Sequence, residues 1–425
     1  MNLVAAPIAV LGALGMPLFA LILGLAMAGF TARGINLGVV AVEFYRLSDT
    51  PVLVAIPLFT FAGYVLSEAN TSTRLVRLTQ AILGWLPGGL AIVSLFICAL
   101  FTAFTGASGV TIVALGALLM PALVRTGYGE KFSLGLVTTS GALGLLIPPS
   151  LPLILYGIVS QQMDTGYGVT MERLFIAGIG PTLLMIGALS VYVVWMSFKH
   201  GVKLTRFSAR EVRAALWAAR WEMPLPFFVL GGIYGGWFAV SEAAAVTALY
   251  VLIVEVLLYR EIPLKRLPGL AVESMLMVGG ILIVLASAMV LTNLMIDAEV
   301  PTKLFAFVKA WIDDKYTFLL VLNIFLLILG ALLDIFAALV IVVPLILPVA
   351  AGYGVDPVHL AMVFLANMQI GYLTPPVGLN LFIASYRFDK PIEQIYHATA
   401  PFIVVLLAAL AVITYWPALS LFLLP

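Results

Sequence analysis

Two segments that lie 227 residues apart combine glycine with paired proline inside long apolar stretches. The first is SGALGLLIPPSLP, residues 140–152, and the second is NMQIGYLTPPVGL, residues 367–379. Their Gly144 and Gly371 have the same separation as their proline pairs (371 − 144 = 375 − 148 = 227). Proline lacks the backbone N–H that an α-helix needs and clashes with the preceding turn. Each segment therefore predicts an interrupted helix, and the constant offset argues against coincidence.

The surrounding sequence is that of a membrane protein. The chain has 425 residues, of which 63% are hydrophobic and 10% charged, whereas about a quarter of the residues of a soluble domain are charged. Apolar runs long enough to cross a bilayer, about 17–25 residues, follow one another along the whole length. We therefore expect an all-α polytopic membrane protein. The net charge of +1 disfavours a nucleic-acid partner, and the phosphate-binding GxxxxGK[ST] motif of ATPases is absent from the sequence.

The offset of 227 extends beyond the two glycine–proline segments. Pro121 matches Pro348, and Gly127 matches Gly354. Internal repeats with interrupted apolar segments at matching positions are typical of secondary transporters. The expected organisation is a first half at 1–198 with a hairpin about 87–125 and a broken helix about 131–160, a basic linker at 199–222, and a second half at 223–425 with a hairpin about 316–351 and a broken helix about 358–387. Hydropathy alone leaves open whether the repeats are inverted.

The linker at 199–222 has six basic and two acidic residues. The excess of positive charge predicts a cytoplasmic location. We favour a solvated linker. The alternative is a helix on the membrane surface, whose apolar side would consist of Leu204, Phe207, Val212, Leu216 and Trp217.

Each interrupted helix is expected to release backbone groups. Without the proline N–H groups, the carbonyls of Gly144 and Leu145 lose their helical partners, as do those of Gly371 and Tyr372. In hydrocarbon such groups must face protein, water or an ion. The carbonyls suit a small cation, and the N-terminus of the helix that resumes suits an anion. The alternative is a proline kink that binds nothing.

A helical hairpin is predicted upstream of each break. The segment FTGASGVT, residues 104–111, lies between apolar arms of about 15 residues, which are too short to cross the hydrocarbon core. A re-entrant hairpin fits that length. The matching segment LGALLDIFAA, residues 329–338, contains Asp334. An acidic group in an apolar run suggests function, although a capping or packing role remains an alternative.

The same tip permits a rival interpretation as an intramembrane serine protease. GASG, residues 106–109, matches a nucleophile motif that would use Ser108 and requires a histidine base. The chain has only His200, His359 and His397. We expect His200 and His397 outside the spans and His359 at a helix start, and a protease has no use for a second broken helix.

Six longer stretches resemble the large membrane subunit of tripartite ATP-independent periplasmic (TRAP) transporters. They are AIPLFTFAGYVL (55–66), TGASGVTIVALGALLMPAL (105–123), GALGLLIPPSLPLILYG (141–157), SEAAAVTALY (241–250), GALLDIFAALVIVVPLILP (330–348) and GVDPVHLAMVFLANMQIGYLTPPVGLNLF (354–382). The resemblance implies sodium-coupled import of an organic acid anion, such as a C4-dicarboxylate, across a bacterial inner membrane. It implies an elevator-type fold with a scaffold and a transport domain, and two partners: a small membrane subunit and a periplasmic substrate-binding protein. A stand-alone dicarboxylate symporter is the alternative.

The resemblance also implies site residues. One sodium ion would be bound between the first tip and the first break, by Ser108, Gly144 and Ile147. The second would be bound between the second tip and the second break, by Gly330, Asp334, Gly371 and Thr374. The substrate carboxylate would lie near Ser108, Thr111, Ser140 and Asn367. The family often has Gly-x-Ser-Gly-Ser-Ala at the first tip, whereas this chain has Gly-Ala-Ser-Gly-Val-Thr.

Overall fold

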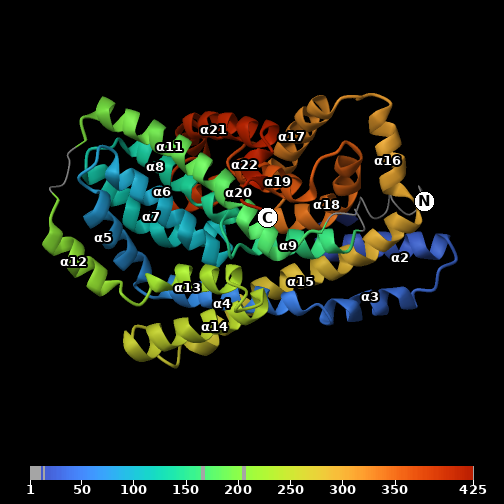
Figure 1. Ribbon diagram of the computed structural model, residues 1–425, viewed down its shortest axis with the longest axis horizontal. Helices are drawn as coiled ribbons and strands as arrows, with labels where there is room; N and C mark the ends of the chain where they lie inside the picture. Colours follow the sequence, from blue (N-terminus) through green and yellow to red (C-terminus); the bar gives the residue numbers. More distant parts are fainter. Residues whose placement is uncertain (1–10, 13–14, 164–167, 203–206, 425) are drawn as a thin grey trace.

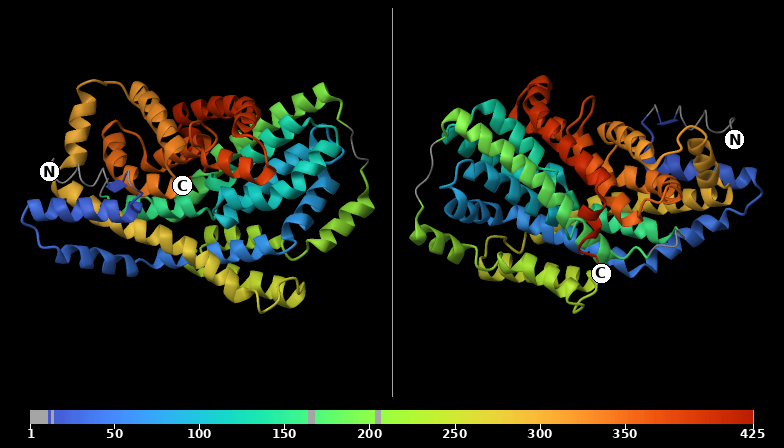
Figure 2. Two further views of the ribbon diagram at one scale, coloured as in Figure 1. Left: turned by 180° about the vertical axis from the view of Figure 1, so that it is seen from behind. Right: turned by 45° about the horizontal axis from the view of Figure 1, so that its top comes forward.

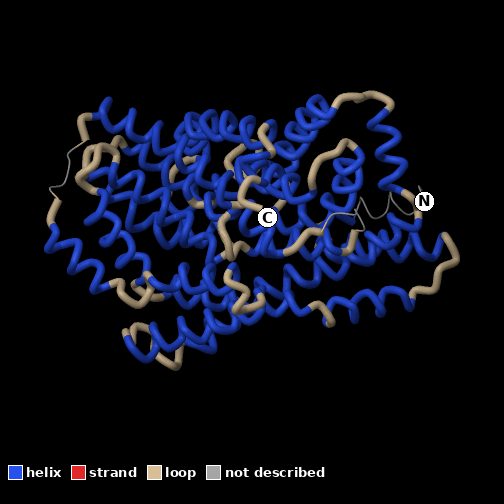
Figure 3. The backbone as a smooth tube through the Cα atoms, in the orientation of Figure 1, coloured by secondary structure: helices blue, strands red, loops and turns tan. Residues whose placement is uncertain are grey.

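The computed structural model describes residues 11–12, 15–163, 168–202 and 207–424, and every regular element within them is helical (Figures 1 and 3). Nine helical segments in these ranges are long and apolar enough to cross a membrane. Shorter apolar helices, such as Gly89–Thr105 and Pro357–Gly371, accompany them. The expected class, an all-α polytopic membrane protein, is confirmed.

The helices of the first half run from α2 to α11. They are α2 (Leu18–Ala32), α3 (Gly38–Ser48), η1 (Pro51–Val54), α4 (Ala55–Glu68), α5 (Thr71–Leu83), α6 (Gly89–Thr105), α7 (Ser108–Arg125), α8 (Glu130–Ser140), η2 (Leu143–Leu146), α9 (Leu151–Gln161), α10 (Met171–Ala177) and α11 (Ile179–His200).

The remaining helices run from α12 to α22. They are α12 (Ala209–Ala218), α13 (Pro224–Tyr234), α14 (Val240–Leu252), the π-helix η3 (Ile253–Leu258), α15 (Leu267–Asp297), α16 (Val300–Lys309), α17 (Lys315–Leu332), α18 (Ile335–Gly352), α19 (Pro357–Gly371), α20 (Leu379–Phe388), α21 (Ile392–Tyr415) and α22 (Ala418–Leu421).

The internal repeat is visible in the helix boundaries. Helix α7 and helix α18 are related by 227 residues at both ends (335 − 108 = 352 − 125 = 227), and α8 and α19 begin at matching residues (357 − 130 = 227). Both proline pairs, Pro148–Pro149 and Pro375–Pro376, also adopt the same cis geometry. The two halves therefore share one backbone plan.

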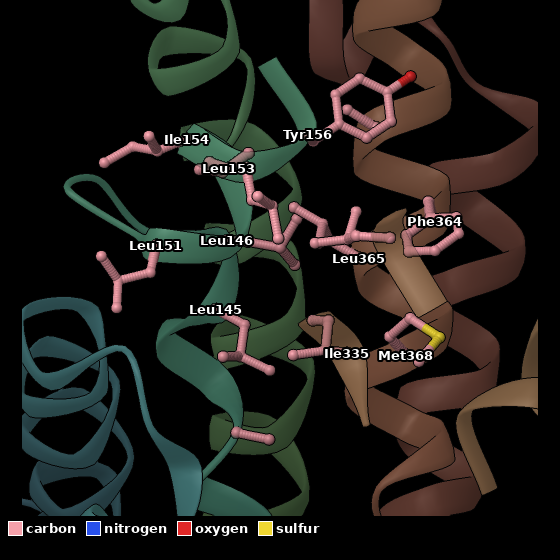
Figure 4. Close-up of a cluster of buried hydrophobic side chains, with 14 of the residues drawn as sticks. Leu145, Leu146, Leu151, Leu153, Ile154, Tyr156, Ile335, Phe364, Leu365 and Met368 are labelled. Carbon is pink, nitrogen blue, oxygen red and sulfur yellow. The ribbon is translucent and has the colours of Figure 1, made fainter. Parts of the chain in front are cut away.

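The halves interlock at their centre. Helix α7 of the first half contacts α20 of the second, and α9 of the first half contacts α18 of the second. Side chains from α9, η2, α18 and α19 form a continuous apolar core between them (Figure 4). Helices α2, α3, α4, α13, α14 and α15 form a layer along one side of this core (Figures 1 and 2).

The described part of the basic linker is folded against the first half. Ala215 and Ala219 bury Leu78 of α5, and Arg77 Nε donates to Glu211 Oε1 over 2.7 Å. The small residues of α12 therefore pack on α5, while Leu216 and Trp217 of the same helix are exposed. Residues 203–206, which include Leu204 of the predicted apolar side, lie outside the described residues.

A buried ionic cluster also fixes α5, one helical turn before Leu78. Arg74 forms ion pairs with Glu222, Glu255 and Glu261, and its Nη2 lies 3.1 Å from Glu255 Oε2. Its guanidinium also lies over the Tyr259 ring, 4.0 Å from the centroid. Burial raises the pKa of Glu222, outweighing the opposing effect of Arg74. The sequence placed Glu222 in a polar linker, but the structure buries it.

Candidate functional site

The first tip connects the two halves through its serine. Helix α6 ends at Thr105 and α7 begins at Ser108. The Ser108 hydroxyl is buried and donates to Asn380 Oδ1 over 2.7 Å. Asn380 lies in the first turn of α20, directly after the second break. Ser108 therefore faces the second half rather than the first break.

Thr111 and Ser140 occupy the space between the first hairpin and α8. The Thr111 and Thr102 hydroxyl oxygens lie 2.6 Å apart, and Thr102 Oγ1 donates to the Gly141 carbonyl over 2.8 Å. Ser140 Oγ donates to the Val137 carbonyl of its own helix. The structure thus brings Thr111 to the end of α8, next to Ser140.

The first break lies against the backbone of α6. Helix α8 ends at Ser140, and α9 resumes at Leu151. A Cβ atom at Gly144 would collide with the carbonyl oxygen of Ala99, so only glycine permits this approach. The structure therefore explains Gly144 by packing as well as by helix interruption.

The second break lies against the backbone of α17. Helix α19 ends at Gly371 and α20 resumes at Leu379. A Cβ atom at Gly371 would lie 2.6 Å from the Cα atom of Gly330. Gly378 N also donates to the Ala331 carbonyl over 3.0 Å. The predicted residues Gly330 and Gly371 are thus in direct contact.

The released carbonyls have found other partners. In the first break the Gly144 carbonyl accepts from Ile147 N over 3.1 Å, and the Leu145 carbonyl accepts from Ser150 Oγ. In the second break the Gly371 carbonyl accepts from Thr374 N over 2.9 Å, and the Tyr372 carbonyl accepts from Asn380 N over 3.2 Å. These four oxygens have lost their helical donors, but each accepts a hydrogen bond from another group. A carbonyl has two lone pairs, so each retains one acceptor position.

Asp334 caps a helix and also contacts the second break. It is exposed and precedes α18, where Oδ2 accepts from Phe336 N over 3.0 Å. Its Oδ1 accepts from the Tyr372 hydroxyl over 2.8 Å, and the same hydroxyl accepts from Ile335 N. Asp334 thus lies at the N-terminal end of α18, and its predicted role in sodium binding stays a prediction. The capping role that was weighed as an alternative is confirmed.

Two further predicted residues, Asn367 and Thr374, form hydrogen bonds away from the first tip. Asn367 Nδ2 donates to Asn323 Oδ1 of α17 over 2.6 Å, and Asn323 in turn donates to Thr414 of α21. Asn367 is therefore bound to α17 and α21 rather than to the first tip. Thr374 Oγ1 donates to the Ile370 carbonyl over 2.9 Å.

Sequence reasoning did not identify Asn380 and Thr102. Asn380 accepts the Ser108 hydrogen bond, and Thr102 holds Thr111 beside Gly141. A polar residue within VGLNLF, directly after the second proline pair, was the available signal for Asn380.

The protease interpretation lacks its base. Ser108 pairs with Asn380 rather than with a histidine. His359 is buried between Ser420 and Thr414, His200 Nδ1 lies beside the Met196 carbonyl, and His397 is exposed. A serine without a neighbouring general base is a weak nucleophile.

Oxygen atoms dominate the surroundings of the second break. The Asp334 carboxylate, the Thr374 hydroxyl and the carbonyls of Gly371 and Tyr372 are hard ligands of the kind that alkali and alkaline-earth cations prefer. Among the described residues, no cluster of three or more histidine, cysteine or acidic side chains could hold a metal ion. These oxygens are the groups at the second break that could act as ligands of a cation.

An all-helical membrane protein with two matching interrupted helices, each packed on a hairpin, belongs to the class of secondary transporters. The comparisons define the family. Residues 5–419 match the family model described as "Tripartite ATP-independent periplasmic transporter, DctM component". The chain belongs to this family of TRAP large permease subunits, as the sequence resemblance indicated.

Curated relatives and a solved structure agree with this assignment. The isethionate TRAP transporter permease protein DctMQ of Oleidesulfovibrio alaskensis is 37% identical over 96% of the chain, which spans 64% of that protein's length. The C4-dicarboxylate TRAP transporter large permease protein DctM of Pseudomonas aeruginosa is 35% identical over 90% of the chain and 88% of its own length. The crystal structure of the Alcanivorax borkumensis YdaH transporter, described as having an unusual topology, shares the fold with a TM-score of 0.64 at 15% identity, covering 90% of this chain and 88% of that one.

Proposed function

We propose that this chain is the large permease subunit of a sodium-coupled importer of an organic acid anion. The observation that carries the proposal is the pair of interrupted helices, each packed glycine-to-backbone against a hairpin. Such breaks place carbonyl oxygens and helix N-termini at the same depth. The relatives are named for isethionate, C4-dicarboxylates and ectoine, which supports a small organic acid as the substrate class.

The proposed sodium sites follow the two breaks. At the second break Asp334, Thr374 and the carbonyls of Gly330 and Gly371 would surround the ion. Support comes from the contact between Gly330 and Gly371 and from the Asp334–Tyr372 hydrogen bond. At the first break the proposed ligands are the Gly144 and Ile147 carbonyls, whereas the Ser108 hydroxyl, which was also predicted to bind this ion, pairs with Asn380 of the second half. A bound sodium ion would supply the free energy for uptake through its gradient.

Two partners complete the proposed transporter. A small membrane subunit would support the layer of α2, α3, α4 and α15, and a periplasmic binding protein would deliver the anion. The proposed location is the bacterial inner membrane, with the basic segment around α12 in the cytoplasm. We further propose an elevator motion, in which the hairpins and broken helices move against that layer.

Reconstitution tests the proposal. The chain and its small subunit are placed in liposomes with the voltage clamped at zero, and succinate and isethionate uptake is measured with each cognate binding protein. We expect uptake that requires both an inward sodium gradient and the binding protein. Uptake that persists without sodium would contradict the coupling. Uptake without the binding protein would identify a stand-alone symporter instead.

A further inference from the structure

The N-termini of two helices from opposite halves meet at a polar pair. Ser108 is the first residue of α7, and Asn380 is the second residue of α20. The Ser108 hydroxyl donates to Asn380 Oδ1 over 2.7 Å, and both side chains are buried. The pair therefore lies where the first tip touches the second broken helix.

The Asn380 side chain is only half satisfied. Its Nδ2 is buried and has no hydrogen-bond partner. An amide has one acceptor end and one donor end, and the Ser108 hydroxyl occupies only the acceptor end. Leaving a buried polar group unpaired is unfavourable. A group that binds there would remove this penalty.

The surroundings of the pair favour an anion. Helices α7, with 18 residues, and α20, with 10, each direct the positive end of their dipole at it. A cleft of about 580 Å³ lies along the same two helices and is lined by Ser67 of α4, by Gly109, Val110, Val113 and Ala114 of α7, and by Phe382, Ile383 and Tyr386 of α20. The lining of the cleft begins one residue after Ser108 and two residues after Asn380.

The internal repeat provides a built-in control. The residues that match Ser108 and Asn380 are Ile335 and Leu153 (335 − 108 = 380 − 153 = 227). They lie at the corresponding ends of α18 and α9, both are buried, and they belong to the apolar core (Figure 4). The fold therefore accommodates apolar side chains at these two positions, so the backbone geometry alone does not require the polar pair Ser108–Asn380.

We propose that Asn380, through its Nδ2, binds a negatively charged oxygen of the transported anion, with Ser108 fixing the orientation of the amide. This inference rests on the proposed function and adds a residue and a location for the anion. It assigns the anion to the α7–α20 junction and leaves the α9–α18 junction closed.

The test is anion-dependent stabilisation of the chain purified with its small membrane subunit. Unfolding temperature is measured first against sodium alone, then against succinate and isethionate in saturating sodium. Asn380→Leu introduces the residue that the repeat already accommodates at Leu153, and Asn380→Asp keeps the acceptor for Ser108 but removes the donor. We expect the half-saturating concentration of the stabilising anion to rise at least about tenfold in both variants. The half-saturating sodium concentration, measured without anion, should change less than about twofold.

A matched amide-to-carboxylate change at the exposed Gln394, Gln394→Glu, controls for added negative charge and should leave the anion titration unchanged. An Asn380→Leu titration that overlays that of the unaltered complex would overturn this inference alone. Lack of any stabilisation by sodium in the unaltered complex would instead count against the proposed function.

Discussion

The two junctions between the halves have the same backbone plan and opposite chemistry. At α7–α20 the helix ends carry Ser108 and Asn380, whereas at α18–α9 they carry Ile335 and Leu153. One junction has an unpaired buried donor, and the other is filled with hydrocarbon. The repeat therefore sets the backbone geometry of the two junctions, while differences at a few residues give them different side-chain chemistry.

The tips differ in the same way. Asp334 precedes α18 and caps it, whereas its mate before α7 is Ala107 (334 − 107 = 227), which offers no side-chain cap. The carboxylate lies at the second break and the free amide donor at α7–α20. This division separates a candidate cation site from a candidate anion site.

The segments that lead into the hairpins also differ. Arg74 in α5 is enclosed by three glutamates, while its mate is Pro301 of α16 (301 − 74 = 227). Helix α5 is therefore held by charge and by the packing of α12. The matching position in α16 has no charged group of its own.

The largest expected effect comes from breaking the ionic cluster. Arg74→Gln would leave buried carboxylates of Glu222 and Glu255 without a cation, which costs about 3–5 kcal/mol. We expect a loss of folded protein in detergent, measured by thermal unfolding. Pro301→Ala at the matching position should change stability far less. Equal losses of stability in the two variants would show that α5 and α16 are not held in place by different interactions.

Substitution of Gly144 and Gly371 tests whether the two breaks share the same close packing against backbone. Gly371→Ala and Gly144→Ala each force a methyl group into backbone, and overpacking costs about 1–3 kcal/mol. We expect both to lower the unfolding temperature and abolish uptake, because the clash at each break is with main chain. Gly279→Ala in α15 meets no atom within 4 Å and serves as the control. If only one of the two alanine variants kept its stability and uptake, the two breaks would not have equivalent backbone packing.

A change at Asp334 tests whether the proposed sodium site is separate from the proposed anion site. Asp334→Asn removes the charge and keeps one acceptor oxygen, which suffices for Phe336 N, while the new amide N–H can donate to the Tyr372 hydroxyl. We expect sodium affinity to fall about tenfold, or about 1.4 kcal/mol, with stability nearly unchanged. Sodium titration of the unfolding temperature measures this. An unchanged sodium response would exclude Asp334 as a ligand.

The smallest expected effect concerns the apolar junction. Ile335→Val removes one buried methylene and should cost about 0.5–1.5 kcal/mol of stability. The anion titration should not change, because the Ile335 and Leu153 side chains have no polar group that could bind the anion. A shift in anion affinity comparable to that of Asn380→Leu would remove the distinction between the junctions.

The sequence predicted the features that depend on local chemistry. The proline pairs located both interruptions, and the offset of 227 anticipated the matching boundaries of α7 and α18. Features that depend on tertiary contacts could not be predicted from the sequence. Nothing in residues 199–222 indicated that Ala215 would pack on Leu78 or that Glu222 would meet Arg74.

The candidate site was predicted unevenly for the same reason. Gly330, Asp334 and Gly371 are close together because the repeat pairs each tip with its own break. Ser108 instead pairs across the halves with Asn380, and Asn367 pairs with Asn323 of α17. Pairing across halves depends on how the repeats interlock, which hydropathy does not specify.

A cryo-EM structure of the transporter in saturating sodium and its transported anion tests the central claim most directly. We predict density for the anion against Asn380 Nδ2 at the α7–α20 junction, with Ile335 and Leu153 still buried in the apolar core at α18–α9. Anion density at the α18–α9 junction, or an Asn380 amide that contacts only protein or water while the anion lies elsewhere, would contradict the account.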